Sequence, residues 1–187
     1  MTTVLVNGLP GVGKTILARE PAGYLGLPLF SKDTVKETLA DSLAPLRPPG
    51  MGDREWSGAP GRAAAESLWS LLADAGGGAV LESWWPATLR PVAAGLRRAG
   101  TGGVHEVWCA APVRVARARC AARVRTGSRH PVHVEEEGDE RWREWERTAQ
   151  PLALGAVHRV DTTAVVEVPA LAGRILAPLR PAVTGEP

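Results

Sequence analysis

The sequence of 187 residues is long enough for one α/β domain, and we expect about 70% of the unfolded surface to be buried on folding. The 22 basic and 20 acidic residues leave a net charge of +2, which gives no general argument for nucleic-acid or membrane partners. Met1 leads directly into an apolar segment without a signal peptide, and no run of about 18 apolar residues follows. We therefore expect a cytoplasmic protein whose two cysteines are reduced and structural.

The first motif is the glycine-rich segment GLPGVGKT, which follows an apolar strand expected at Thr2–Val6. It satisfies the pattern G-x-x-x-x-G-K-[ST] with Gly8, Gly13, Lys14 and Thr15, directly before a helical segment. Successive backbone N–H groups in such a loop form a concave nest for phosphate oxygens, and the helix N-terminus favours an anion. The alternative, a flexible turn matching by chance, is disfavoured by the strand-loop-helix context. The expected nucleotide-binding residues are Gly8, Gly11, Val12, Gly13, Lys14 and Thr15.

The remaining elements alternate between short apolar strands and longer helical segments. Pro21 should stop or kink the first helix near Glu20, and Pro45–Pro60 is expected to be a loop rich in glycine and proline. We expect further strands at Leu27–Phe30, 79–82, Val104–Cys109 and Val157–Val160, and helices at 31–43, Ala63–Ala75, Ala87–Ala99, Pro112–Arg125, Asp139–Ala149 and from Val168. This alternation predicts a parallel sheet covered by helices on both faces.

Asp33 is the first candidate for chemistry outside the phosphate loop. It follows the second predicted strand at the start of a helix, and in a parallel sheet this position lies on the edge where ligands bind. A carboxylate there can accept the proton of a substrate hydroxyl and hold the hydroxyl in line with a γ-phosphate. The structural alternative is that Asp33, or Ser31, caps the helix.

Four motifs together resemble a known group of proteins: NGLPGVGKT, FSKDTVKETL, RHPVH and VDTT. They look like the small bacterial P-loop kinases that include chloramphenicol phosphotransferase, the zeta-toxin kinases and the kinase part of polynucleotide kinase, with gluconate and shikimate kinases more distant. The resemblance extends from Val4 to about Leu176. It implies a five-stranded parallel sheet of the nucleoside-monophosphate-kinase type, a small helical lid at about residues 117–137, ATP as donor, Mg²⁺ as cofactor and Asp33 as the base.

The arginine-rich helix expected at Pro112–Arg125 supplies candidates for nucleotide contacts. Arg119 and Arg123 flank one side of its apolar stripe, and the resemblance places nucleotide and lid arginines on and after this helix. It favours Arg117 and Arg123, with Arg129 in the following loop as a third candidate, and Arg123 is expected to act in catalysis. Arginine suits this work because its planar guanidinium pairs with phosphate oxygens. The alternative is an exposed helix that happens to be rich in arginine.

Further candidates lie at the ends of the predicted strands. Glu82 ends the strand AVLE, where an acid can reach the Mg²⁺ shell together with the Thr15 hydroxyl. The loop VDTT resembles the segment that borders the adenine in these kinases, which makes Asp161 and Thr162 nucleotide candidates. Of the seven tryptophans, three are weak candidates for a pocket wall: Trp56, Trp84 and Trp85. We do not predict a metal site at the H-x-x-H spacing of the loop RHPVH.

These observations predict a single P-loop kinase domain over residues 1–180, with a tail at 181–187. The expected activity is transfer of the γ-phosphate of ATP to a hydroxyl of a small molecule, such as an antibiotic, a nucleoside or a sugar-like metabolite. A polynucleotide 5′-hydroxyl kinase is one alternative, although the near-neutral charge disfavours nucleic acid as a partner. The other is a nucleotide-binding regulatory protein without an acceptor. No N-K-x-D motif of GTPase type is visible.

Overall fold

The computed structural model describes residues 1–87, 91–134 and 138–177. Its centre is one five-stranded sheet in the order β2-β3-β1-β4-β5, and every neighbouring pair is parallel. This confirms the predicted parallel sheet and its five strands. The strands are β1 Thr2–Asn7, β2 Leu29–Ser31, β3 Ala79–Glu82, β4 Gly103–Ala110 and β5 Ala156–Asp161.

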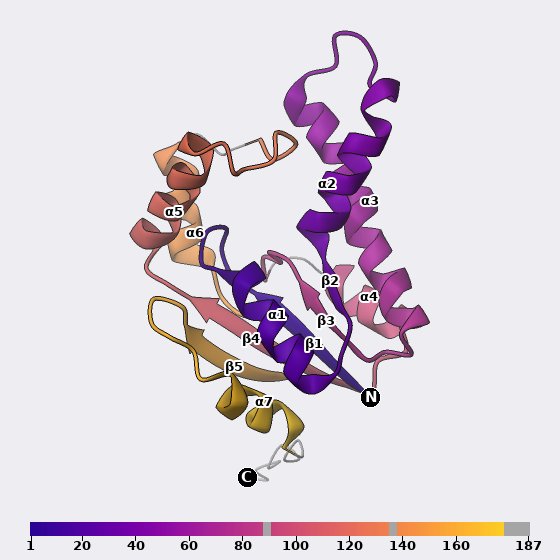
Figure 1. The fold of residues 1–187 in the computed structure, drawn as a ribbon, viewed down its shortest axis with the longest axis vertical. Helices are drawn as coiled ribbons and strands as arrows, with labels where there is room; N and C mark the ends of the chain where they lie inside the picture. The colour runs from indigo at the N-terminus through magenta and orange to yellow at the C-terminus, as the bar shows by residue number, and fades with distance from the viewer. Residues whose placement is uncertain (88–90, 135–137, 178–187) are drawn as a thin grey trace, which may run out of the picture.

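Helices cover both faces of the sheet, as Figure 1 shows. In the described residues they are α1 Lys14–Leu25, α2 Lys32–Leu43, α3 Asp53–Asp74, α4 Pro91–Arg98, α5 Val113–Arg125, α6 Asp139–Thr148 and α7 Val168–Leu176, with a 3₁₀ turn at Ala44–Leu46. The helices α2 and α3 form a long pair that projects beyond the sheet, and α5 with α6 stands opposite them (Figure 1). None of these helices is both long enough and apolar enough to span a bilayer.

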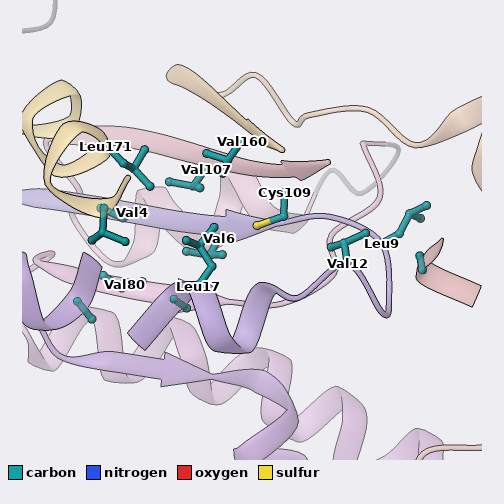
Figure 2. Close-up of a cluster of buried hydrophobic side chains, with 14 of the residues drawn as sticks. Val4, Val6, Leu9, Val12, Leu17, Val80, Val107, Cys109, Val160 and Leu171 are labelled. Atoms are coloured by element: carbon teal, nitrogen blue, oxygen red, sulfur yellow. The ribbon is translucent and has the colours of Figure 1, made fainter. Parts of the chain in front are cut away.

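The alternation of side chains along the strands divides the core into two layers. Val4 and Val6 of β1 pack beneath α1 and α7 in one cluster, part of which Figure 2 shows. Leu5, between them in sequence, belongs to the cluster on the other face with Trp69 of α3 and Leu96 of α4. A strand buried on both faces has no exposed side, which is why Val4, Leu5 and Val6 of β1 are all apolar.

Two proline-based expectations differ from the structure. The first helix, expected to stop or kink near Glu20, does not stop there but continues through Pro21 to Leu25, where Gly26 in the left-handed conformation ends it. The region Pro45–Pro60 is not all loop either, because α3 begins at Asp53 and contains Pro60. Each proline removes one helical hydrogen bond, and both prolines are buried, so packing of the helix offsets that loss.

The other boundaries agree within a few residues. The helix expected at Ala87–Ala99 is described from Pro91 to Arg98, and residues 88–90 lie outside the described part of the chain. The lid region expected at about 117–137 comprises part of α5 and a loop at 126–134, and its last residues, 135–137, are not described. The predicted tail at 181–187 also lies outside the described residues.

Candidate active site

The phosphate loop begins where β1 ends and is shaped by close backbone packing. Gly8 has φ +145°, and a Cβ added there would lie 2.5 Å from the carbonyl oxygen of Cys109. Gly11 has φ +82°, and an added Cβ would collide with the carbonyl of Ala116 in α5. Only glycine tolerates both the conformation and the contact. The loop is thereby seated against β4 and α5 before its last glycine, Gly13, starts α1.

Asn7, the last residue of β1, fixes the start of this loop. Its Oδ1 accepts hydrogen bonds from the backbone N–H groups of Gly8 (2.8 Å) and Trp85 (3.0 Å). Its Nδ2 donates to the Trp85 carbonyl (3.1 Å) and to Oε1 of the buried Glu106 (2.9 Å). A fully buried amide with these partners ties β1, β4 and the segment after β3 together. Sequence reasoning gave Asn7 and Glu106 no role.

A cavity of about 480 Å³ opens directly beside the phosphate loop. Its walls come from the loop, from the starts of α1 and α2, from the end of β3, from α5 and from the lid loop, which we define as residues 126–134. The cavity brings together these predicted site residues: Gly11, Gly13, Lys14, Thr15, Asp33, Glu82, Arg123 and Arg129. Gly8 and Val12 pack behind the loop, where they shape it.

Lys14 is buried at the base of the cavity. Its Nζ donates to the carbonyl oxygen of Leu9 at 2.9 Å, which curls the side chain back over the loop. Burial lowers its pKa, and the neighbouring Glu82 carboxylate opposes that shift. An ammonium held this close to loop N–H groups can pair with a phosphate oxygen.

Glu82 and two hydroxyls form an all-oxygen group at the end of β3. Ser31 donates from Oγ to Oε2 of Glu82 at 2.6 Å. Burial raises the pKa of Glu82, whereas Lys14 and hydrogen bonds from Ser31 and Thr15 oppose that shift. Magnesium prefers one or two such oxygens and completes its shell with phosphate and water. The residues therefore suit Mg²⁺, and among the described residues no cluster of three or more His, Cys, Asp or Glu could hold a metal by itself.

Asp33, in the first turn of α2, lines the same cavity as the phosphate loop. The cap of α2 is Ser31, whose side chain accepts from the Thr34 N–H at 3.5 Å, so the cap does not depend on Asp33. Oδ2 of Asp33 is 3.8 Å from Nη1 of Arg129. Burial raises the pKa of Asp33, but the nearby His133 and the cationic Arg129 and Lys14 lower it by more. Asp33 is consequently ionised at neutral pH and able to accept a proton.

The arginines of α5 differ in what they contact. Arg119 donates to the carbonyl oxygens of Val12 (3.3 Å) and Thr162 (3.2 Å) and lines the cavity together with Arg123. Arg117, which the sequence favoured, does not line the cavity and pairs with Asp139 at 2.5 Å. On a helix of 3.6 residues per turn, Arg119 lies about 60° from the buried Ala116 and Arg117 about 100° from it. Arg119 rather than Arg117 therefore lines the cavity.

Comparison with known proteins agrees with this geometry. Residues 4–152 match the family model AAA_33, described as an AAA domain. The chain belongs to this AAA domain family. No curated protein matches the chain.

Solved structures extend the comparison over nearly the whole chain. A presumed kinase from Chloroflexus aurantiacus is 29% identical with a TM-score of 0.79, and the match covers 93% of this chain and 96% of that one. A sugar kinase from Janibacter sp. HTCC2649 (20%, TM-score 0.55, 94% and 92% covered) and a gluconokinase from Sinorhizobium meliloti 1021 (19%, 0.52, 94% and 90%) share the fold. This AAA-domain protein thus has the fold of small P-loop kinases, as the sequence motifs predicted.

A second cavity of about 420 Å³ adjoins the first and shares Gly13, Ile16 and Arg119 with it. Its lining is mostly apolar, with Ile16 and Leu17 of α1 facing residues 164–166 and Val168. Thr162 lines it, and its Oγ1 donates to the Ala110 carbonyl at 3.0 Å. Asp161 does not line it, because its Oδ1 accepts from the N–H and Oγ1 of Thr163. Of the two adenine candidates, the geometry favours Thr162.

Of the three tryptophan candidates, one lines the main cavity and two do not. Trp84 lines the main cavity. Trp85 is buried in the core and stacks on Trp69, with ring centroids 6.3 Å apart. Trp56 lies under the guanidinium of Arg47, 6.0 Å from the ring centroid, and lines a different pocket. Adjacent residues in an extended segment point to opposite sides, which separates Trp84 from Trp85.

The two histidines of the lid loop join it to α2. Nε2 of His133 lies 2.7 Å from Oε1 of Glu37, and Nε2 of His130 lies 3.1 Å from Oδ1 of Asp41. Glu37 and Asp41 are one turn apart on α2, so the two contacts seat the lid loop along one face of that helix. Figure 1 shows the loop after α5 reaching toward α2. Of the two, His133 lines the main cavity, whereas His130 lines a separate pocket beside Asp41.

Proposed function

We propose that this protein transfers the γ-phosphate of ATP to a hydroxyl group of a small molecule. The observation that carries the proposal is the ionised Asp33 carboxylate in the same cavity as Lys14 of the phosphate loop. A nucleotide switch needs the loop alone, whereas a carboxylate facing it provides the proton acceptor that a hydroxyl nucleophile requires. The AAA-domain family and the kinase folds among the solved structures support the general activity.

The donor would occupy the two adjoining cavities. Its phosphates lie along Gly11–Thr15, where loop N–H groups and Lys14 contact them, and its base lies in the apolar cavity beside Thr162. Arg119 lies between the cavities and Arg123 lines the main one, so both can pair with phosphate oxygens. Mg²⁺, held by Thr15 and Glu82, would screen charge between the β- and γ-phosphates.

In the reaction the acceptor hydroxyl lies between Asp33 and the γ-phosphorus. A bond forms from the hydroxyl oxygen to phosphorus as the bond from phosphorus to the β-γ bridging oxygen breaks, and ADP leaves with that electron pair. Asp33 accepts the hydroxyl proton. Lys14, Arg119 and Arg123 neutralise charge that moves toward the leaving oxygen. Trp84 and the lid loop exclude water, which limits hydrolysis of ATP.

A mass-spectrometric screen tests the proposal. The protein is incubated with ATP, Mg²⁺ and a panel of nucleosides, sugars, hydroxy acids, antibiotics and a 5′-hydroxyl oligonucleotide, and products are examined for the gain of one phosphoryl group. We expect a small-molecule product that the Lys14→Ala variant does not form. Transfer only to the oligonucleotide would favour a polynucleotide kinase, and tight ATP binding with no product from the whole panel would favour a regulatory protein.

A further inference from the structure

Glu106 of β4 is a buried acid to which the proposed reaction gives no role. The residue is only 1% exposed, and it does not line the main cavity. Burial of a carboxylate costs free energy unless hydrogen bonds or an opposite charge compensate it. The partners of Glu106 therefore show what the fold uses this carboxylate for.

Three N–H donors converge on the Glu106 carboxylate. Oε1 accepts from Nδ2 of Asn7 at 2.9 Å and from the backbone N–H of Leu152 at 3.0 Å. Oε2 accepts from the backbone N–H of Ala153 at 2.9 Å. Leu152 and Ala153 are successive residues between α6 and β5, and two successive N–H groups directed at one anion form a nest. A side chain of the protein itself fills this nest.

The backbone of Ala153 shows that the carboxylate organises this segment. Ala153 has φ +54°, and among the described residues no other residue except glycine has a positive φ. A residue with a Cβ adopts this left-handed conformation only where surrounding contacts hold it there. The hydrogen bonds from the N–H groups of Leu152 and Ala153 to Glu106 are such contacts.

The third donor, Asn7, connects Glu106 to the phosphate loop. A carboxylate only accepts hydrogen bonds, whereas the two ends of an amide are alike in size and differ in that one donates and the other accepts. Glu106 therefore requires Nδ2 of Asn7 to face it, which directs Oδ1 toward the N–H groups of Gly8 and Trp85. With the amide reversed, Nδ2 would face two donors. Glu106 thus selects the orientation of Asn7 that holds the first glycine of the loop.

The same amide also positions part of the cavity wall. Asn7 bonds both the N–H and the carbonyl of Trp85, at 3.0 and 3.1 Å, and the preceding residue, Trp84, lines the main cavity. The loop that begins at Gly8 carries Lys14 into that cavity. Displacement of reacting groups by about 1 Å can lower a rate by on the order of 100-fold, so the orientation of Asn7 matters for the chemistry.

We propose that Glu106 is a positioning residue for the phosphoryl transfer: through Asn7 it fixes the start of the phosphate loop and the place of Trp84, without touching either substrate. The proposal rests on the proposed kinase function and adds to it a residue outside the cavity. It requires the carboxylate itself, because a neutral amide of the same shape has only one accepting end. Such an amide can satisfy at most two of the three donors, and its NH₂ group meets the remaining N–H.

The first experiment tests the requirement for a carboxylate with Glu106→Gln. Binding of the non-hydrolysable analogue AMP-PNP with Mg²⁺ is measured by calorimetry, at a temperature where melting curves show each variant to be folded. We expect binding about tenfold weaker than in the parent. His105→Gln is the matched control, because the side chain at the adjacent position of β4 points to the opposite face and contacts His158. Its affinity should stay within about twofold of the parent.

The second experiment exchanges the acid and the amide. Asn7→Asp alone places two carboxylates against each other, and we expect it to weaken analogue binding more than Glu106→Gln does. In the double variant, Asn7→Asp with Glu106→Gln, the NH₂ group of glutamine can donate to the new carboxylate. Its binding should recover by about tenfold relative to Asn7→Asp. Asn7→Ser removes the Nδ2 donor and leaves the nest at Glu106 intact, so it should also bind about tenfold more weakly if the carboxylate variants fail to fold.

The third measurement is phosphoryl transfer to the acceptor that the mass-spectrometric panel identifies. In folded Glu106→Gln, kcat at saturating ATP and acceptor should fall about tenfold, and in His105→Gln it should not. A residue that only stabilises the fold would lower the melting temperature and leave the kcat of the folded molecules unchanged.

The outcomes separate the role of Glu106 from the kinase function. Parental analogue binding and parental kcat in folded Glu106→Gln would overturn the positioning role, as would parental binding in Asn7→Ser. A double variant whose loss equals the product of the two single losses would also overturn it, because Glu106 would then not act through Asn7. Recovery in the double variant, with no transfer by the parent to any compound, would support the placement of the loop by Glu106 and contradict the kinase function.

Discussion

The main cavity has a proposed donor half, formed by the phosphate loop with Arg119 and Arg123, and a proposed acceptor half, formed by Asp33, Lys36 and the lid loop. The two halves are built by different means. In the donor half, backbone contacts fix most of the geometry. The loop glycines pack against β4 and α5, and the Asn7 side chain makes four hydrogen bonds where the loop begins. In the acceptor half, side chains from segments far apart in sequence meet through Lys36 with Ser57 and His133 with Glu37. The donor half is consequently fixed by a short motif, whereas the acceptor half can change its specificity through single side chains.

Glycine substitutions in the two halves test this difference and have the largest expected effect. Alanine at Gly11 would meet the Ala116 backbone in a left-handed conformation, so Gly11→Ala should displace the loop and abolish measurable ATP binding. Alanine at Gly61 in α3 would lie 3.5 Å from Cε of Lys36, an ordinary contact, and should be tolerated. ATP titration and thermal melting measure both. Equal loss of ATP binding in the two variants would show that backbone packing does not distinguish the halves.

Removal of the loop cation should have the next largest effect. Lys14→Ala should reduce phosphoryl transfer by about 100-fold or more, because it deletes a charge placed to follow the migrating phosphoryl group. The variant should fold, since loss of a buried lysine with a lowered pKa also removes a desolvation cost. Turnover is measured at saturating acceptor, and turnover near that of the parent would place the chemistry away from Lys14.

Substitutions of two arginines of α5 test which side of this helix belongs to the donor half. Arg119→Ala should raise KM for ATP by about tenfold, because Arg119 lines both cavities that we propose for the nucleotide. Arg117→Ala should change it by less than about twofold, because Arg117 contacts Asp139 on the surface. Steady-state kinetics of the two variants give the comparison. Similar small changes at both positions would reduce α5 to an ordinary solvated helix.

The smallest expected effect is a pH dependence of stability that arises from a histidine pair outside both halves of the cavity. His105 and His158 stack on neighbouring strands, with Nδ1 and Nε2 3.0 Å apart. Burial lowers the pKa of both, and their mutual repulsion further lowers that of His158. The unfolded chain therefore binds protons more readily, so stability present above about pH 6.5 is lost as pH falls through that value.

Melting curves between about pH 7 and pH 5.5 check this sign. The melting temperature of the parent should fall over this range, and the fall should be smaller in His158→Gln, which retains only one histidine of the pair. Catalytic variants such as Lys14→Ala should show the same pH dependence of melting as the parent. A parent that gains stability on acidification would contradict the assignment.

The contrast between local motifs and contacts across distant segments also explains which features could be predicted from the sequence. Each strand and the phosphate loop follow from local patterns, namely apolar runs and a glycine spacing that backbone geometry dictates. The start of α3 at Asp53 was missed because Gly and Pro suggest a loop, although Asp53 and Glu55 mark a helix N-terminus. Arg119 and the Lys36–Ser57 contact were missed because each depends on packing between distant elements. Asn7 carries no local signal beyond its place before the loop.

The central claim is that Asp33 accepts a proton from a hydroxyl that attacks the phosphate held by the loop. The turnover of Asp33→Asn tests this claim most directly. Ser31 caps α2, so asparagine at position 33 should leave folding unchanged, and the donor half should bind ATP with the affinity of the parent. The account predicts a loss of about 100-fold in turnover on the identified acceptor, since the proton acceptor is gone. Turnover within a few fold of the parent, or a parallel collapse of ATP affinity, would contradict it.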